Sequence, residues 1–467
     1  MHAHVERATP PSSGARGVWD RSRRALTIGL VAVVAFTAFE ALAVATVLPV
    51  TVREIGGLHL YGWTFSAFML ANLVGIVAAG GASDRSGLTP PFIAGTALFV
   101  AGLVVAGVAP SMPVVVAGRF VQGFGAGAIG AVSYAAIAAG YDDAAKPRML
   151  ALLSSAWVVP GLVGPALAGL IADHVGWRWV FLGLAPPTLA AAAVAIPALR
   201  RLSRASEAAT RDDRLRSAVL LAAGAGCTLL ALDGVAQLAS PLLFVAGVAI
   251  GVPALRRLLP EGTLRAAPGQ PAAVAVMGLI GLAFFGAEAF VPLALTDVRG
   301  QPASLAGLPL TLGTLTWTAG AWVQAREAPR RSRSGLVAAG VALVALGIAA
   351  AVSVLLPDVP FMVATLAWGV AALGMGMAYS TSALVILETA PPDRQGESSA
   401  ALQLSITLGT ALGTGAGGAV LALLTAAAWP LASAIAAVFA TTVAALAVAL
   451  VVAFRLPGRP RARAPYA

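Results

Sequence analysis

Charged residues are scarce in this chain, and their scarcity excludes a large class of proteins. Only 11% of the 467 residues are Asp, Glu, Lys or Arg, whereas 59% are hydrophobic. Soluble domains carry roughly 25% charged residues. A water-facing surface cannot be built from this composition, which excludes a soluble enzyme. The apolar runs are continuous rather than alternating, so we expect membrane-spanning helices and not a closed barrel.

Cysteine, histidine and lysine are also rare. The single cysteine, Cys227, excludes an intramolecular disulfide and a cysteine-rich metal site. The four histidines, His2, His4, His59 and His174, are scattered, so we expect no metal site and no cofactor other than protons. The one lysine follows an alanine, which rules out the Gly-Lys-Ser/Thr phosphate loop of an ATP-driven pump.

The net charge of +10 does not indicate a nucleic-acid partner, because the arginines lie in short loops between apolar runs. The first 24 residues are polar and basic, with no apolar run before a cleavage site. We therefore expect no cleaved signal peptide. The expected surroundings of most of the chain are the lipid bilayer.

Fourteen apolar runs are long enough to cross a bilayer, for which about 20 mostly apolar residues are needed. They cover approximately 25–49, 62–82, 91–110, 113–138, 149–172, 179–199, 217–237, 239–255, 272–295, 303–325, 335–356, 360–386, 398–427 and 430–454. The sequence thus predicts an all-α polytopic membrane protein with 14 transmembrane helices.

This pattern predicts five regions along the chain. They are a cytoplasmic N-terminal tail (1–24), an N-terminal six-helix bundle (25–199), a linker with two inserted transmembrane helices (200–270), a C-terminal six-helix bundle (271–455) and a cytoplasmic C-terminal tail (456–467). No loop between the apolar runs is long enough to form a folded soluble domain.

The basic residues are distributed unevenly between the two sides of the membrane. Nearly all of the 30 Lys and Arg residues fall on the side that carries both termini, and the loop exceptions are Arg53, Arg178 and Arg299. Cytoplasmic loops are enriched in Lys and Arg. We therefore expect a multi-pass protein of the cytoplasmic (inner) cell membrane with both termini in the cytoplasm. The bias fixes an even number of spans, and the two additional apolar runs favour fourteen over twelve.

The first and last six apolar runs resemble each other. The chain reads AFTAFEAL around Glu40 and AFFGAEAF around Glu288, at an offset of 248 residues. The same offset carries Gly161 onto Gly409 within glycine-rich fifth runs. Parallel repeats of this kind favour a transporter whose substrate site lies between the two halves, near the middle of the bilayer. The alternative is chance similarity in an alanine-rich chain.

The second apolar run ends in GGASDRSG. Its glycines allow two helices to approach closely, and its charged residues lie at the cytoplasmic surface, where contacts that break and re-form can gate that side. With the six-helix repeat, this run resembles the G-x-x-x-D-R-x-G-R-[RK] loop signature of the major facilitator superfamily. Gly80, Asp84, Arg85 and Gly87 match it, whereas leucine and threonine replace the two trailing basic residues. The alternative is an ordinary polar turn.

The fourth run begins with GRFVQGFGAGAIG. Arg119 lies within an apolar segment, where an arginine costs at least about 2.5–3.5 kcal/mol and normally faces a partner or a cavity. Arg119, Gln122 and Gly123 match the R-x-x-Q-G signature of the family's fourth helix, and the resemblance implies a role of Arg119 in proton coupling. In the alternative, the arginine extends to the outer interface.

The fifth run contains WVVPGLVGPALAG, in which Pro160 and Pro165 interrupt the helix and Gly161, Gly164 and Gly169 leave one face bare. It resembles the family's antiporter signature, centred on G-x-x-x-G-P-x-x-G-G, although alanine replaces one glycine. This signature marks proton-linked exporters more than uptake symporters. The alternative is generic helix packing.

Three carboxylates lie within or near apolar runs. Glu40 lies in a run that ends in Leu-Pro and resembles the first helix of the fourteen-helix drug/proton antiporter branch, where the acid is more often Asp. A carboxyl group surrounded by apolar groups holds a proton more readily than one in water. We therefore assign Glu40, its repeat counterpart Glu288, Arg119 and, less centrally, Asp233 to proton coupling. The alternative for each acid is a structural hydrogen bond, which is favoured for Asp233.

The sequence says less about the substrate. We place Gln122 and Trp157 in the substrate cavity, although membrane tryptophans more often serve in packing or as interface anchors. The predicted function is a proton-coupled antiporter that exports small hydrophobic or amphipathic compounds by alternating access, acting as a monomer. One alternative is a dedicated exporter of a lipid or secondary metabolite. A more remote one is a non-transporting membrane sensor or assembly partner.

Overall fold

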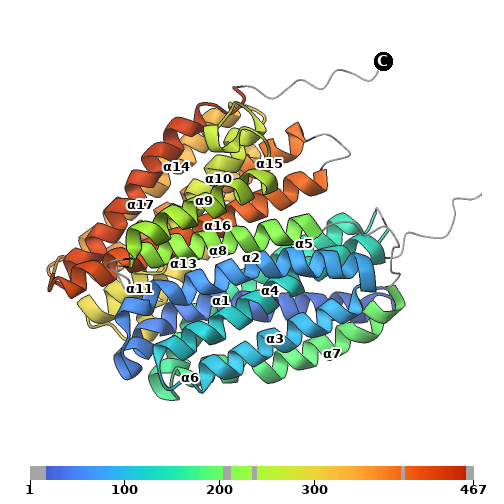
Figure 1. Ribbon diagram of the computed structural model, residues 1–467, viewed down its shortest axis with the longest axis horizontal. Helices are drawn as coiled ribbons and strands as arrows, with labels where there is room; N and C mark the ends of the chain where they lie inside the picture. Colours follow the sequence, from blue (N-terminus) through green and yellow to red (C-terminus); the bar gives the residue numbers. More distant parts are fainter. Residues whose placement is uncertain (1–16, 143, 203–211, 234–238, 391–394, 459–467) are drawn as a thin grey trace, which may run out of the picture.

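The computed structural model describes residues 17–142, 144–202, 212–233, 239–390 and 395–458. Within these ranges the regular secondary structure is entirely helical (Figure 1). The continuous apolar runs explain this result, because a backbone N–H inside a bilayer must be bonded within its own helix. The predicted all-α membrane fold is confirmed.

The helices form two bundles with a helical hairpin between them in sequence. The first bundle consists of α1 (Arg24–Ile55), α2 (Tyr61–Ser86), α3 (Thr89–Gly107), α4 (Met112–Gly140), α5 (Lys146–His174), α6 (Arg178–Leu182) and α7 (Ala185–Leu202). The hairpin consists of α8 (Asp212–Leu232) and α9 (Ser240–Leu258).

The second bundle consists of α10 (Gln270–Glu288), α11 (Val291–Leu293), α12 (Ala303–Ala306), α13 (Leu308–Glu327), α14 (Arg333–Ala351), α15 (Phe361–Thr389), α16 (Gln395–Ala426) and α17 (Leu431–Ala453). A five-residue π-helical segment (Ala294–Val298) follows α11. Short 3-10 turns lie at Leu58–Leu60, Thr263–Arg265 and Val352–Leu355.

In the described part of the chain, thirteen helical segments are long and apolar enough to cross a membrane. The remaining predicted run, 303–325, forms α12 and α13. With 20 residues, α13 is roughly 30 Å long, which is sufficient for a span. It is more polar than most of the other long helices, since it carries four threonines and ends in Gln-Ala-Arg-Glu.

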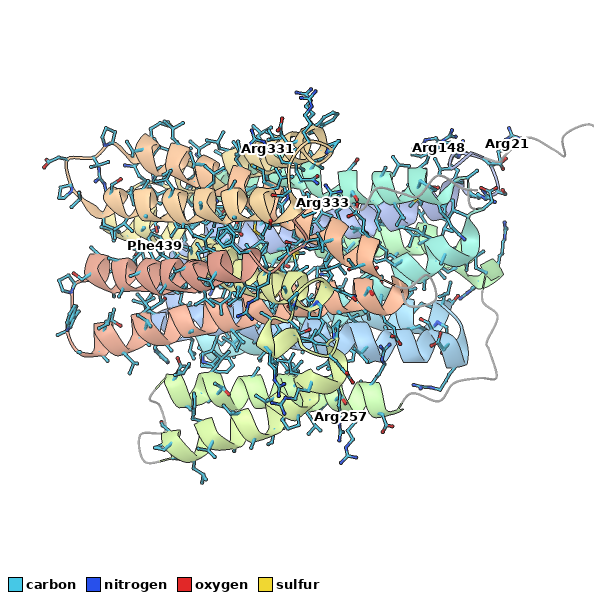
Figure 2. The ribbon with its side chains drawn as sticks, turned by 90° about the horizontal axis from the view of Figure 1, so that it is seen from above. Arg21, Arg148, Arg257, Arg331, Arg333 and Phe439 are labelled. Atoms are coloured by element: carbon cyan, nitrogen blue, oxygen red, sulfur yellow. The ribbon has the colours of Figure 1, made fainter. Side chains whose placement is uncertain are left out.

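Two ends can be distinguished in both bundles. We call the end at which α1 begins and α17 finishes the termini end, and the other the far end. Arginines flank several helices at the termini end. They include Arg21 before α1, Arg148 in α5, Arg257 in α9 and Arg331 after α13 (Figure 2).

The two bundles repeat the same arrangement. When the first residues of α2, α4 and α5 are moved by 248 positions, they fall within one residue of the first residues of α13, α15 and α16. The packing corresponds as well, because α2 packs on α4 as α13 packs on α15, and α1 packs on α5 as α10 packs on α16. The sequence repeat thus has a structural counterpart in helix order, register and packing.

The contacts between the bundles gather at the far end. The Ser66 hydroxyl of α2 donates to the carbonyl oxygen of Ala411 in α16 at 2.8 Å. The Tyr61 hydroxyl donates to the carbonyl oxygen of Ala289, also at 2.8 Å. Asp173, at the end of α5, accepts hydrogen bonds from the backbone N–H groups that open α12. These bonds close the far end of the molecule.

The two halves of α5 differ in how far other helices cover them. Gly161 and Gly164, in its second half, are buried against α13 and α1. About one and three turns before Gly161, on the same face of the helix, Trp157 is 49% exposed and Leu150 is 41% exposed. The face of α5 that meets the second bundle near the far end is thus uncovered toward the termini end.

Candidate functional site

The first bundle holds a buried ion pair. Glu40 lies midway along α1 and is 1% exposed, and Arg119 lies two turns into α4 and is 2% exposed. Nη1 of Arg119 donates to Oε1 of Glu40. The structure thus brings together two of the predicted proton-coupling residues from different helices.

Further groups complete the surroundings of Arg119. Its Nε donates to the carbonyl oxygen of Thr64 at 3.2 Å, and its Nη1 reaches Oε1 of Gln122 at 3.2 Å. The guanidinium carbon lies 4.1 Å from the centre of the Phe68 ring, a cation–π geometry. A buried charge needs this degree of satisfaction to be tolerated. The burial of Arg119 does not fit the alternative in which its side chain extends to the interface.

Two polar atoms in this cluster, Oε2 of Glu40 and Nε2 of Gln122, form no hydrogen bond of regular geometry with a described residue, although the Gln122 side chain lies near the Glu40 carboxylate. Buried polar atoms are nearly always hydrogen-bonded, so each exception calls for an explanation. A free carboxylate oxygen beside an intact ion pair is a position where a proton can bind. Gln122 is fully buried within this cluster, rather than exposed on the wall of a cavity, in the present conformation.

Glu288 lies in a different environment. It is the last residue of α10, is only partly buried, and has no hydrogen-bonding or ionic partner within the described ranges. The position that corresponds to Arg119 in the second bundle is Ala367, so no guanidinium is available there. The structure therefore does not join Glu288 to the Glu40–Arg119 pair.

An aromatic cluster lies in the second bundle close to Glu288. Phe284 and Phe285 of α10 contact Trp317 of α13 at ring-centre distances of 5.7 and 6.2 Å. Trp368 of α15 lies 4.8 Å from Phe284, and Tyr379 lies 5.6 Å from Trp317. Phe285, one turn before Glu288 on the same side of α10, is partly exposed, as are Trp317 and Tyr379. The cluster was not predicted as a unit, because its members come from three helices.

Asp233 connects the end of α8 to α2. It follows the last turn of α8, and its Oδ2 accepts a hydrogen bond from Nε1 of Trp63 in α2. Glu40 and Arg119 are not among its contacts. This placement fits the structural alternative that the sequence favoured for Asp233.

The predicted gating loop lies at the termini end. Asp84 and Arg85 are exposed in the last turn of α2 and form no ion pair with any described residue. Gly87 ends the helix with φ +79°, a conformation that favours glycine. A Cβ at Gly80 would meet nothing within 4 Å, so the close helix approach expected there is absent in this conformation.

The antiporter-like segment lies at the interface between the bundles. Helix α5 runs through Pro160 and Pro165 without interruption, contrary to the expected break. A Cβ added at Gly161 would overlap the side chain of Thr314 in α13, and one at Gly169 would overlap the backbone of Ser304 in α12. The glycines of this segment thus allow close contact with the second bundle.

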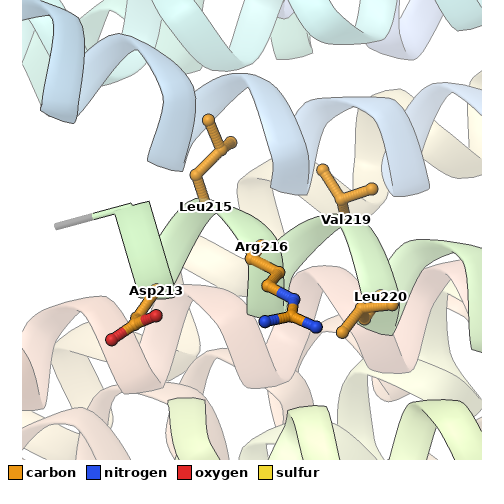
Figure 3. Close-up of a pocket in the computed structure, with 5 residues that line it drawn as sticks. All are labelled: Asp213, Leu215, Arg216, Val219 and Leu220. Carbon is orange, nitrogen blue, oxygen red and sulfur yellow. The ribbon is translucent and has the colours of Figure 1, made fainter.

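The described residues contain no group of three or more His, Cys, Asp or Glu side chains suited to a metal ion. A cavity of about 480 Å³ lies on α8 at the termini end and is lined by Asp213, Leu215, Arg216, Val219 and Leu220 (Figure 3). None of the predicted site residues lines this cavity.

Comparisons with known proteins agree on family. The sequence model described as Major Facilitator Superfamily matches residues 28–414. An uncharacterized MFS-type transporter of Mycobacterium tuberculosis is 30% identical over 297 residues, which cover 60% of this chain and 42% of that protein. A probable multidrug-efflux transporter of the same species is 35% identical over 136 residues, 29% of each chain. The matched region thus spans less than half the length of these curated relatives.

Solved structures agree on the fold. A bacterial homologue of the human lysosomal transporter Spinster, in an inward-facing and unoccupied conformation, has a TM-score of 0.68 at 15% identity and covers 93% of this chain and 96% of its own. A POT family transporter in complex with 5-aminolevulinic acid has a TM-score of 0.68 at 11% identity, with 94% and 97% covered. At these identities the likeness concerns the fold alone.

Proposed function

The chain belongs to the Major Facilitator Superfamily, and its fold is that of non-enzymatic transporters. On this premise we propose that it is a proton-coupled antiporter that exports small hydrophobic or amphipathic compounds across the cytoplasmic membrane by alternating access. The observation that carries the proposal is the buried Glu40–Arg119 pair with its unpartnered carboxylate oxygen.

Proton binding at Glu40 changes the charge balance inside the first bundle. The guanidinium of Arg119 keeps its proton, so it loses its counter-ion when Glu40 becomes neutral. An unpaired arginine within the membrane costs at least about 2.5–3.5 kcal/mol. This cost favours a rearrangement of α1 against α4. One proton that crosses 100 mV releases about 2.3 kcal/mol, so one or two protons suffice for steep efflux.

The distribution of contacts between the bundles supports alternating access. The bundles are bonded at the far end through Ser66 and Tyr61, whereas the interface residues of α5 are exposed toward the termini end. With both termini in the cytoplasm, as the loop charges predict, this conformation is open to the cytoplasm. Substrate then enters from the cytoplasm, and protons enter when the far end opens.

The second bundle offers suitable surroundings for an apolar substrate. Phe285, Trp317 and Tyr379 are partly exposed, and Glu288 lies one turn from Phe285 without a partner among the described residues. Binding sites for small molecules are mostly apolar and aromatic, with few polar groups. Relatives named as multidrug transporters support this assignment at modest identity.

The proposal is tested with purified protein in vesicles that contain a pH-sensitive dye. Ethidium and the neutral dye Nile red serve as probes, and a pH gradient is the only energy source. We expect probe-induced proton movement and uphill probe accumulation in the wild type, and neither in Glu40→Gln. Glu54→Gln is the matched control, because Glu54 lies on the same helix but pairs with Arg178 near the far end.

Each alternative gives a different result in this assay. If Glu40→Gln still accumulates a probe against its gradient, the coupling assignment is wrong. A dedicated exporter moves a labelled phospholipid or a single metabolite class but neither dye. A sensor or assembly partner moves none of these compounds in the wild type.

A further inference from the structure

The hairpin of α8 and α9 lies over the seam between the two bundles. Helix α8 contacts α2 of the first bundle and α16 of the second (Figure 3). A small buried cluster joins the three helices and includes Leu70 of α2, Leu221 and Leu229 of α8, and Leu408 of α16. Any rocking of the bundles must therefore displace α8 from at least one of its two neighbours.

The contacts of α8 with α2 include a hydrogen bond and buried side chains. Trp63 donates to Asp233 at the far end. Leu70 and Leu73 are buried among the α8 side chains, and a Cβ at Gly226 would lie 4.0 Å from Leu70. Interlocked side chains of this size resist sliding, because packed interiors hold discrete arrangements. Helix α8 is thus held on the first bundle by a hydrogen bond and by buried side chains.

The contacts of α8 with α16 are less extensive than those with α2. Leu229 fills the space over Gly415, where an added Cβ would lie 2.5 Å from its side chain, and Leu408 of α16 is buried in the same cluster. An ion pair between Arg214 and Glu397 has a distance of 3.7 Å between partly exposed side chains. Such exposed pairs contribute about 0–1 kcal/mol. The surface on α16 is therefore smaller than the surface on α2, which the Trp63–Asp233 hydrogen bond also secures.

The two helices of the hairpin pack closely on each other, and a short segment after α9 connects the hairpin to the second bundle. A Cβ at Gly224 of α8 would lie 2.6 Å from Cα of Gly251 in α9, so the two helices are in backbone contact. After α9 the chain is attached to the second bundle, since Nη1 of Arg455 donates to the carbonyl oxygen of Arg265 at 2.7 Å. The few residues between Leu258 and Arg265 therefore connect two differently held bodies.

We propose that the hairpin α8–α9 moves as part of the first bundle, and that its face on α16 is the surface along which the second bundle slides during transport. This inference rests on alternating access as set out under the proposed function. In this role the inserted helices move with the first bundle and present the face that contacts the second bundle.

Two matched cysteine pairs test the inference in a Cys227→Ser background. The pair Leu70→Cys with Gly226→Cys bridges α2 to α8, and the pair Leu229→Cys with Gly415→Cys bridges α8 to α16. A short bis-methanethiosulfonate closes each bridge and dithiothreitol opens it. We expect the α2–α8 bridge to preserve probe transport and the α8–α16 bridge to reduce it about tenfold or more, reversibly, because it blocks the conformational change that transport requires.

A second measurement separates failure of this inference from failure of the proposed function. Hydrogen exchange of residues 58–66 and 411–418 reports opening of the far end without transport. On a pH step, the α8–α16 bridge should abolish the change in exchange, and the α2–α8 bridge should leave it intact. The inference is overturned if the α2–α8 bridge blocks opening, or if neither bridge does. If the reduced variants open but move no probe, the proposed function fails while the exchange data still decide the role of the hairpin.

Discussion

Ala367 of α15 occupies, in the second bundle, the position that Arg119 of α4 occupies in the first. The two lie 248 residues apart, as do Glu288 and Glu40. Each bundle thus places a carboxylate within the membrane, but only the first supplies it with a guanidinium. Glu40 is paired and fully buried, whereas Glu288 is partly buried and unpaired among the described residues. The same substitution should therefore affect the two acids differently.

Glu40→Gln should destabilise the protein, because it leaves the Arg119 charge buried without its counter-ion. Removing one partner of a buried pair costs about 3–5 kcal/mol. We expect a lower midpoint of thermal unfolding in detergent. Glu288→Gln is the control and should not lower the midpoint, since an amide is easier to bury than an unpaired carboxylate. Equal losses in both variants would contradict the difference in pairing.

The pair itself can be tested by a double-mutant cycle. Arg119→Gln alone should be as damaging as Glu40→Gln, and the variant with both substitutions should recover part of the lost stability. A coupling of about 1–3 kcal/mol is expected for residues in direct contact within one network. Additive effects of the two substitutions, measured by the same unfolding assay, would show that the two side chains do not interact.

The lack of a cationic partner for Glu288 among the described residues leads to a third prediction. Ala367→Arg should be tolerated better when Glu288 is present than when it is replaced, because only the carboxylate can neutralise the new charge. A membrane arginine without a partner costs at least about 2.5–3.5 kcal/mol. The midpoint of Ala367→Arg with Glu288→Gln should therefore lie below that of Ala367→Arg alone. The reverse order of the two midpoints would show that position 367 and Glu288 do not interact.

Closure of the far end depends on Gly62, where a Cβ would overlap the carbonyl oxygen of Thr414 and approach Gly418. Gly62→Ala should push α2 away from α16 and favour the conformation that is open at the far end. We expect faster labelling of Ala289→Cys by an impermeant maleimide in a Cys227→Ser background. Gly80→Ala is the control on the same helix, because a Cβ at Gly80 meets nothing within 4 Å. Acceleration by both substitutions would point to general loosening.

The fold could be predicted from the sequence because the apolar runs and the internal repeat each extend over many residues. Apolar runs of about 20 residues identify spans, and the offset between Glu40 and Glu288 identifies the repeat that the helix register bears out. The run 303–325 is the predicted span that is absent from the thirteen segments apolar enough to cross a membrane, and the threonines of α13 explain why. The family assignment from the Gly80–Gly87 and Arg119–Gly123 signatures is confirmed.

The candidate site could be predicted only in part. Residue type and depth identified Glu40 and Arg119 separately, but their contact depends on how α1 packs beside α4. The hydrogen bond from Arg119 to the carbonyl oxygen of Thr64 cannot be predicted from a sequence pattern, because every residue has a carbonyl oxygen. The aromatic cluster was missed for a related reason, since Phe284, Trp317 and Trp368 come together only through the packing of three helices.

The hydrogen bonds that close the far end run from side chains to main chain. Ser66 donates to the carbonyl oxygen of Ala411, and Tyr61 to that of Ala289. The acceptors persist whatever side chain stands at positions 289 and 411, provided that it fits. During evolution the donor positions are therefore constrained by chemistry, whereas the acceptor positions are constrained only by size. Closure at this end can survive extensive divergence of one bundle without matched changes in the other.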